Sequence, residues 1–203
     1  SINVQMNIST DLLINSYKQN DSLLNTVSEN LFKYFEKRSL FPAAAHLSNK
    51  LLTDNTCALN NSLANTMQRY VTLRVGNIAP DIKLGNKNLS DIKKPVLLVF
   101  GASDCPHCKD GALELLRYYD TWKAKKNLEV VYVSLDTDKK AYETAYQNAP
   151  WQMFCDYKGY KTKAAKDYFV NATPTYILLD KNLKILEHPN SISHVDAWVN
   201  YRL

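Results

Sequence analysis

The chain has 203 residues, of which 45% are apolar, so it can bury a sizeable core without disulfide staples. Its 25 basic and 20 acidic residues give a net charge of only +5, with no lysine or arginine cluster and no interleaved aromatic residues, which argues against a nucleic-acid partner. No apolar run approaches the roughly 18 residues of a membrane-spanning helix, so we expect no integral membrane span.

Residues 1–75 show helical periodicity and no convincing strand. Pro42 opens a short alanine-rich helix, because the first turn of a helix does not need the N–H group that proline lacks. Apolar residues recur at helical spacing after a predicted N-cap at Asp21 and again further on; they are Leu23, Leu24, Val27, Leu31, Tyr34 and Phe35, then Leu59, Leu63, Met67 and Tyr70. We therefore predict an all-α N-terminal region built of structural helices.

The stretch 75–81 breaks the helical period and marks the predicted domain boundary, with a helical region at 1–75 and a second domain at 76–203. In the second domain short β-type runs alternate with helical segments, which predicts βαβ units and a mainly parallel sheet. Strands are expected at 96–100, 128–135, 175–179 and 183–186, and helices at 106–124, 138–148 and 161–168. The last two strands should pair as a hairpin, and a final helix is expected from Ser193, capped by Ser193 and Asp196.

Two cysteines, Cys105 and Cys108, stand two residues apart directly after the run 96–100 and at the start of the helical pattern. This position places the sulfur of Cys105 at the amino end of the helix, where free N–H groups and the helix dipole favour a thiolate. Cys108 lies one turn into the helix and can attack a mixed disulfide formed by Cys105. The pair therefore predicts thiol-disulfide exchange, with Cys105 as the nucleophile and Cys108 as the resolving thiol.

The two residues between the cysteines are Pro106 and His107. His107 can place an imidazole beside the Cys105 thiolate and so stabilise the reduced form, whereas Pro106 fits the first helical position on backbone grounds alone. The main alternative chemistry is a zinc site. His46, His107, His188 and His194 do not form a second cluster at zinc-ligand spacing, so we expect no metal and no cofactor.

The order of strand, CxxC helix, strand, helix, proline loop, hairpin and helix resembles the thioredoxin fold over roughly residues 76–203. The stretch 96–108 is similar to the active-site segment of the thioredoxin superfamily, and Thr173-Pro174 stands where that superfamily keeps a cis-proline. The lead-in Ala79-Pro80-Asp81 resembles the TlpA/ResA branch of exported, often membrane-tethered thiol-disulfide proteins, while Cys-Pro-His-Cys is similar to DsbA-type oxidants. The resemblance implies a thioredoxin-like fold with a central mixed sheet flanked by helices.

This resemblance also implies a substrate-binding role for Thr173 and Pro174. A cis bond there would point the Thr173 backbone toward an extended substrate beside Cys105. The sequence departs from the family at three positions near the motif: Val99 replaces a buried acid, Asp104 replaces an aromatic residue, and Gly101 replaces a common tryptophan. The Gly101 change is expected to open the surface beside the active site, and Asp104 is expected to oppose the Cys105 thiolate.

We interpret the chain as a thiol-disulfide oxidoreductase that acts on cysteine-containing exported proteins, with a membrane redox protein as its electron partner and an exported, periplasmic or membrane-tethered location. One alternative is a thiol peroxidase, but peroxiredoxins carry a threonine and a proline where this chain has Ala102 and Leu98. Another is a binding or adaptor module in which residues 1–75 recruit a partner. Cys57 and Cys155 are expected to be unpaired buried residues, with a disulfide between them as the alternative.

Overall fold

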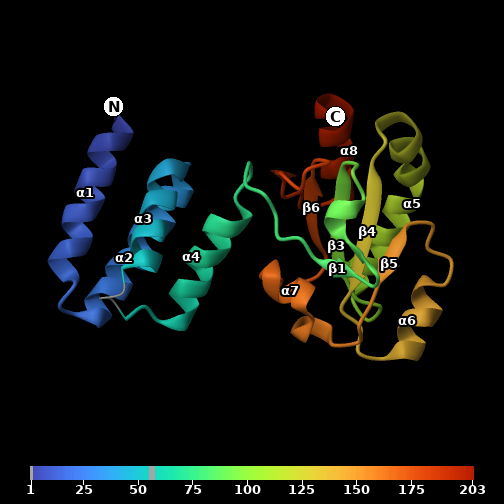
Figure 1. Ribbon diagram of the computed structural model, residues 1–203, viewed down its shortest axis with the longest axis horizontal. Coiled ribbons are helices and arrows are strands. Elements are labelled where there is room, and N and C mark those ends of the chain that lie inside the picture. Colours follow the sequence, from blue (N-terminus) through green and yellow to red (C-terminus); the bar gives the residue numbers. More distant parts are fainter. Residues whose placement is uncertain (1, 55–57) are drawn as a thin grey trace. The chain divides into compact units, whose positions relative to one another are not determined.

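The structure is a computed structural model that describes residues 2–54 and 58–203 (Figure 1). It divides into two compact units, residues 1–74 and residues 75–203. Cys57, with its expected state, lies outside the described residues. Within the described ranges, none of the helices combines the length and the apolar character that crossing a membrane requires.

The described residues of the first unit form four helices, α1 (Ile2–Tyr17), α2 (Asp21–Lys37), α3 (Phe41–Thr53) and α4 (Asn61–Leu73). Their shared core is formed by fully or nearly fully buried apolar residues: Ile14, Leu24, Phe32, Phe35, Ala43, Ala44, Leu47, Leu51, Leu63 and Met67. The N-cap of α2 is Asn20 and not Asp21, because the Asn20 side chain accepts the Leu23 N–H at 3.0 Å while Asp21 is already helical. The predicted all-α region is confirmed, and the predicted cap is wrong by one residue.

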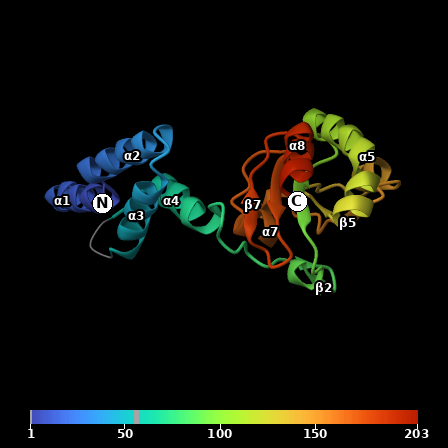
Figure 2. The same cartoon turned by 90° about the horizontal axis from the view of Figure 1, so that it is seen from above.

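The second unit contains a sheet with helices on its faces (Figures 1 and 2). Its strands are β3 (Val96–Gly101), β4 (Glu129–Ser134), β5 (Gln152–Phe154), β6 (Thr175–Leu179) and β7 (Ile185–Glu187). Its helices are α5 (Pro106–Lys126), α6 (Lys139–Tyr146), α7 (Lys163–Asp167) and α8 (Ile192–Arg202), with short 3-10 turns η1 (Leu89–Asp91) and η2 (Gly159–Lys161). A separate two-stranded ribbon, β1 (Lys83–Leu84) and β2 (Lys87–Asn88), precedes them.

The strand order is β5-β4-β3-β6-β7. Strands β3, β4 and β5 run parallel, whereas β6 is antiparallel to β3 and β7 is antiparallel to β6. The predicted hairpin is confirmed, but the expectation of a mainly parallel sheet is wrong, because that hairpin adds two antiparallel pairings to the two parallel ones. The mixed sheet implied by the family resemblance is the one observed. The short edge strand β5 was not predicted.

Helices α5 and α8 cover one face of this sheet (Figure 2). Alternate side chains of β3, β4 and β6 meet them in one core cluster that includes Leu97, Val99, Val130, Tyr132, Tyr176 and Leu178, with Leu115, Tyr119 and Trp122 from α5 and Ile192, Val195 and Val199 from α8. The Trp122 indole N–H donates to the Asp196 carboxylate at 2.9 Å and joins the two helices. On the other face Phe100 packs against Tyr168, which follows α7.

The cap of α8 also differs from the prediction. Ser191 is the N-cap, and its hydroxyl oxygen accepts the His194 N–H at 3.1 Å, whereas Ser193 lies inside the first turn. Asp196, the other predicted member of the capping box, instead accepts the hydrogen bond from Trp122.

We expect Ser191→Ala to lower the free energy of unfolding of the second unit by about 1 kcal/mol, because the first turn of α8 loses its side-chain acceptor. Ser193→Ala is the matched control and should change it by less than about 0.5 kcal/mol. Urea unfolding followed by tryptophan fluorescence measures both values. A larger loss for Ser193→Ala than for Ser191→Ala would contradict the observed cap.

Candidate active site

The two sulfur atoms of the CxxC pair lie at the amino end of α5, directly after the carboxyl end of β3, and are joined in a disulfide. Cys105 is the N-cap of α5, and its Sγ accepts the Cys108 N–H at 3.1 Å. Cys105 is half-buried, whereas Cys108 is 2% exposed. An incoming thiol can therefore reach Cys105, whereas burial protects Cys108 from attack.

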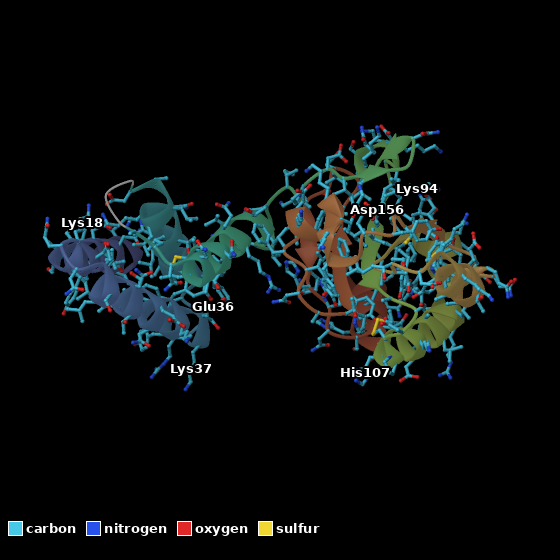
Figure 3. All side chains as sticks on the ribbon, turned by 90° about the horizontal axis from the view of Figure 1, so that it is seen from below. Lys18, Glu36, Lys37, Lys94, His107 and Asp156 are labelled. Atoms are coloured by element: carbon cyan, nitrogen blue, oxygen red, sulfur yellow. A yellow bond between two sulfur atoms is a disulfide. The ribbon has the colours of Figure 1, made fainter. Side chains whose placement is uncertain are left out.

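Pro106 and His107 form the first two residues of α5, and both side chains are exposed. Figure 3 labels His107 and shows the disulfide as a yellow bond beside it. The described part of the chain has no group of three or more histidine, cysteine, aspartate or glutamate side chains placed to hold a metal ion.

The loop before β6 lies against the redox pair. The Thr173–Pro174 peptide bond is cis, as the family resemblance implies. The carbonyl oxygen of Thr173 lies 3.6 Å from Cys105 Sγ, although 68 residues separate the two in the sequence. The structure therefore brings Cys105, Cys108, Thr173 and Pro174 together, and it places main-chain hydrogen-bonding groups next to the more accessible sulfur.

Buried tyrosine side chains lie on the strands next to β3, which leads into the cysteine pair. Val99, at the centre of β3, is flanked by Tyr132 of β4 and Tyr176 of β6, and both phenols are buried. Burial raises the pKa of Tyr132 and Tyr176, so both remain neutral near pH 7. The Tyr132 hydroxyl lies 3.2 Å from that of Tyr146, whose pKa burial raises to about 12.

Gly101 does not open the surface beside the active site, contrary to the sequence-based expectation. It is buried, and a Cβ atom on it would overlap the hydroxyl and ring of Tyr132. The space that a larger residue would need is thus taken by a side chain from the neighbouring strand. Nothing in the sequence pairs these two residues, because the contact depends on the register of β3 and β4.

A buried carboxylate that the sequence reasoning missed lies under the loop before Cys105. Asp136, two residues beyond β4, accepts the Ser103 N–H at 3.1 Å and also the Ser103 hydroxyl. The Ser134 hydroxyl donates to its second oxygen at 2.5 Å. The available signal was an acidic residue directly after a buried strand, at the edge where the carboxyl ends of parallel strands meet.

Two further features lie near this edge. Cys155 follows β5, is half-buried, and its sulfur lies 3.6 Å from the Asp136 main-chain oxygen; burial raises the pKa of its thiol. A shallow pocket of about 560 Å³ lies between the start of α5 and α6, lined by Ser103, Lys109, Asp138, Lys140, Ala141, Thr144 and Ala145. Trp151 is buried in the core of the second unit. In the first unit, the His46 imidazole lies 2.8 Å from the Asp11 carboxylate.

Comparison with known proteins agrees with this geometry. Residues 93–185 match the family model described as thioredoxin-like. A thiol-disulfide oxidoreductase from Bacteroides fragilis is 30% identical, with a TM-score of 0.57, and the match covers 63% of this chain and 100% of that one. The chain belongs to the thioredoxin-like family. Its second unit has the fold and the redox pair of a thiol-disulfide oxidoreductase, and we call it the thioredoxin-like domain.

Two other matches extend the comparison. Tryparedoxin from Trypanosoma brucei brucei is 30% identical over 90 residues, which are 44% of this chain and 62% of tryparedoxin. The chain spans less than two thirds of the length of the curated relatives it matches. A thioredoxin-like protein from Bacteroides caccae has a TM-score of 0.68 at 14% identity and covers 99% of this chain and 78% of its own, so its likeness concerns the fold and includes helices α1–α4.

Proposed function

We propose that the thioredoxin-like domain exchanges disulfides with cysteine-containing proteins through Cys105 and Cys108. The observation that carries the proposal is the position of Cys105 Sγ. It accepts the Cys108 N–H at the amino end of α5, is more accessible than Cys108, and lies 3.6 Å from the Thr173 carbonyl oxygen. Hydrogen-bond donors at a helix end stabilise a thiolate, and a thiolate is the form that attacks a disulfide.

In the oxidising direction, a client thiolate attacks Cys105 Sγ and the Cys108 thiolate leaves, which forms a mixed disulfide. A second client thiolate then attacks the client sulfur of that bond and releases Cys105 as a thiolate. Two electrons pass from the client to the pair, and the client leaves as a disulfide. In the reducing direction, the Cys105 thiolate attacks a client disulfide and Cys108 resolves the intermediate. No cofactor enters either sequence of steps.

Thr173 and Pro174 are proposed to bind the client. The Thr173 main chain faces the sulfur that would carry the client, so an extended client segment can pair with it by strand-like hydrogen bonds. We further propose that the clients are exported proteins, that the protein acts in the periplasm or tethered to the outer face of the inner membrane, and that a membrane redox protein exchanges electrons with it. The support for these finer points is the resemblance of residues 79–81 and of the motif to exported thiol-disulfide proteins.

His107 and Pro106 are proposed to tune the pair. We expect the couple to lie above about −270 mV and below about −120 mV, the values of thioredoxin and DsbA. His107→Pro should shift it in the reducing direction by about 30 mV, which is a tenfold change in the equilibrium constant, because an exposed imidazole next to Cys105 no longer supports the thiolate.

Equilibration of the full chain with glutathione buffers measures both potentials. His188→Gln, an exposed histidine beyond β7, is the control and should leave the potential unchanged. A wild-type value at or below that of thioredoxin, together with no effect of His107→Pro, would contradict the tuning role and would favour a reductase.

A further inference from the structure

Asp136 is the buried acid that holds the loop in front of the redox pair. It is 6% exposed, and both of its carboxylate oxygens accept hydrogen bonds from Ser103 and Ser134. The Ser103 N–H points at both oxygens, at 3.1 and 3.2 Å, and the Asp136 N–H in turn donates to the Ser134 hydroxyl oxygen at 3.1 Å. The acid thus joins the end of β4 to the chain that leads into Cys105.

The charge on Asp136 is not neutralised by a cation. Within residues 2–54 and 58–203, no ion pair joins this carboxylate to a lysine, arginine or histidine. Burial of a carboxylate without a cation is costly unless hydrogen bonds compensate, and the serine hydroxyls and the Ser103 N–H supply them.

The groups around Asp136 experience its negative charge. Burial is the largest cause that raises the pKa of Tyr132, Tyr142, Tyr146 and Cys155, and the charge of the Asp136 carboxylate is a further cause for all four groups. These four groups come from β4, from α6 and from the end of β5, and they are neutral near pH 7. The exposed titratable side chains of the active-site loop and its neighbours include Asp104, His107, Lys109, Asp110, Asp138 and Lys140, and solvent screens their charges.

We propose that Asp136 is a positioning residue that fixes the Cys105 loop to β4 and, through its buried charge, shifts the disulfide equilibrium of the pair toward the oxidised form. Ser103 precedes Cys105 by two residues, which span at most about 7 Å of chain. The Asp136 carboxylate contacts Ser103, two residues before the nucleophile, and a buried negative charge beside this loop disfavours the Cys105 thiolate and so opposes the effect of the helix end. The inference rests on the proposed function, because it concerns the poise of the same pair.

The test is Asp136→Asn in the full chain, equilibrated with glutathione buffers. Asparagine keeps an oxygen that accepts the Ser103 N–H and an amide that donates to Ser134, so the loop stays in place while the charge is lost. We expect the equilibrium constant to move about tenfold toward the reduced pair, which corresponds to about 30 mV in the oxidising direction. The pH midpoint of Cys105 alkylation should fall in the same variant.

Two controls separate charge from loop structure. Asp104→Asn removes a charge of the same sign that is closer in sequence but exposed, and it should move the equilibrium less than about threefold. Asp136→Glu keeps the charge and should stay within about threefold of the wild type. If Asp136→Asn does not fold, Asp136→Ser is the second neutral variant, and its equilibrium constant is measured in the same glutathione buffers.

The inference would be overturned if the folded neutral variant had the same redox equilibrium as the wild type. It would also be overturned if Asp136→Glu shifted the equilibrium as much as Asp136→Asn, because Asp136 would then have only a structural role. Both outcomes are measured as the equilibrium of the cysteine pair with glutathione, so neither measurement needs a client protein. Failure of the wild-type protein to exchange disulfides with a client would instead contradict the proposed function, so the two failures are distinguishable.

Discussion

Cys105→Ala is expected to reduce disulfide exchange to the uncatalysed rate, a loss on the order of 10³-fold or more, as is typical when an enzyme loses its nucleophile. The reason is geometric. Cys105 Sγ is the more accessible sulfur of the pair and the one that accepts a hydrogen bond from the helix end, so no other cysteine of the site can replace it. Cys108→Ala should also lose turnover, but it should retain the first attack.

The measurement is the rate at which the full chain, in a dithiothreitol-coupled assay, reduces a quenched fluorescent peptide disulfide. Cys155→Ser is the matched control, since its thiol lies beyond β5 and burial raises its pKa; it should retain at least half of the activity. Comparable activity of Cys105→Ala and the wild type would contradict the assignment of the nucleophile.

Gly111→Ala is expected to destabilise the thioredoxin-like domain by about 1–3 kcal/mol, although alanine normally stabilises a helix. Gly111 lies in α5, and a Cβ atom there would overlap the Tyr176 hydroxyl oxygen. The next ring atom of Tyr176, Cζ, would stand at 3.7 Å, an ordinary van der Waals contact. The Tyr176 hydroxyl oxygen is therefore the single atom with which an alanine Cβ at position 111 would clash.

This geometry makes the sign of the Gly111 effect depend on Tyr176. In a Tyr176→Phe background the oxygen is absent, so Gly111→Ala should be neutral or stabilise by up to about 1 kcal/mol. The double-mutant cycle, measured by urea unfolding, should give a coupling of about 1–4 kcal/mol. A destabilisation that persists unchanged in the Phe background would show that the oxygen is not the cause.

Much of this architecture could be predicted from local pattern. The runs 96–100, 128–135 and 175–179 became β3, β4 and β6, and the hairpin after residue 179 is present. The position of Cys105 at a strand-to-helix junction followed from the change from a short continuous apolar run to a helical pattern, which is a local property.

The features that local pattern could not predict are helix caps and contacts between segments that are distant in the sequence. The two missed caps differ from the expected ones by one or two residues, because neighbouring Asn, Asp and Ser residues can all cap a helix and only the backbone decides. Tyr132 fills the space beside Gly101 from another strand, and Asp136 reaches Ser103 across 33 residues. Strand register sets both contacts, and register is not encoded in either segment alone.

We propose that disulfides pass through Cys105. The most direct test is to incubate Cys108→Ala of the full chain with a client peptide disulfide, quench with acid, and map the trapped mixed disulfide by mass spectrometry after proteolysis. The expected result is a single adduct on Cys105, because the resolving thiol is missing and the first attack is intact. An adduct on Cys155 or Cys57, or none at all, would contradict the account.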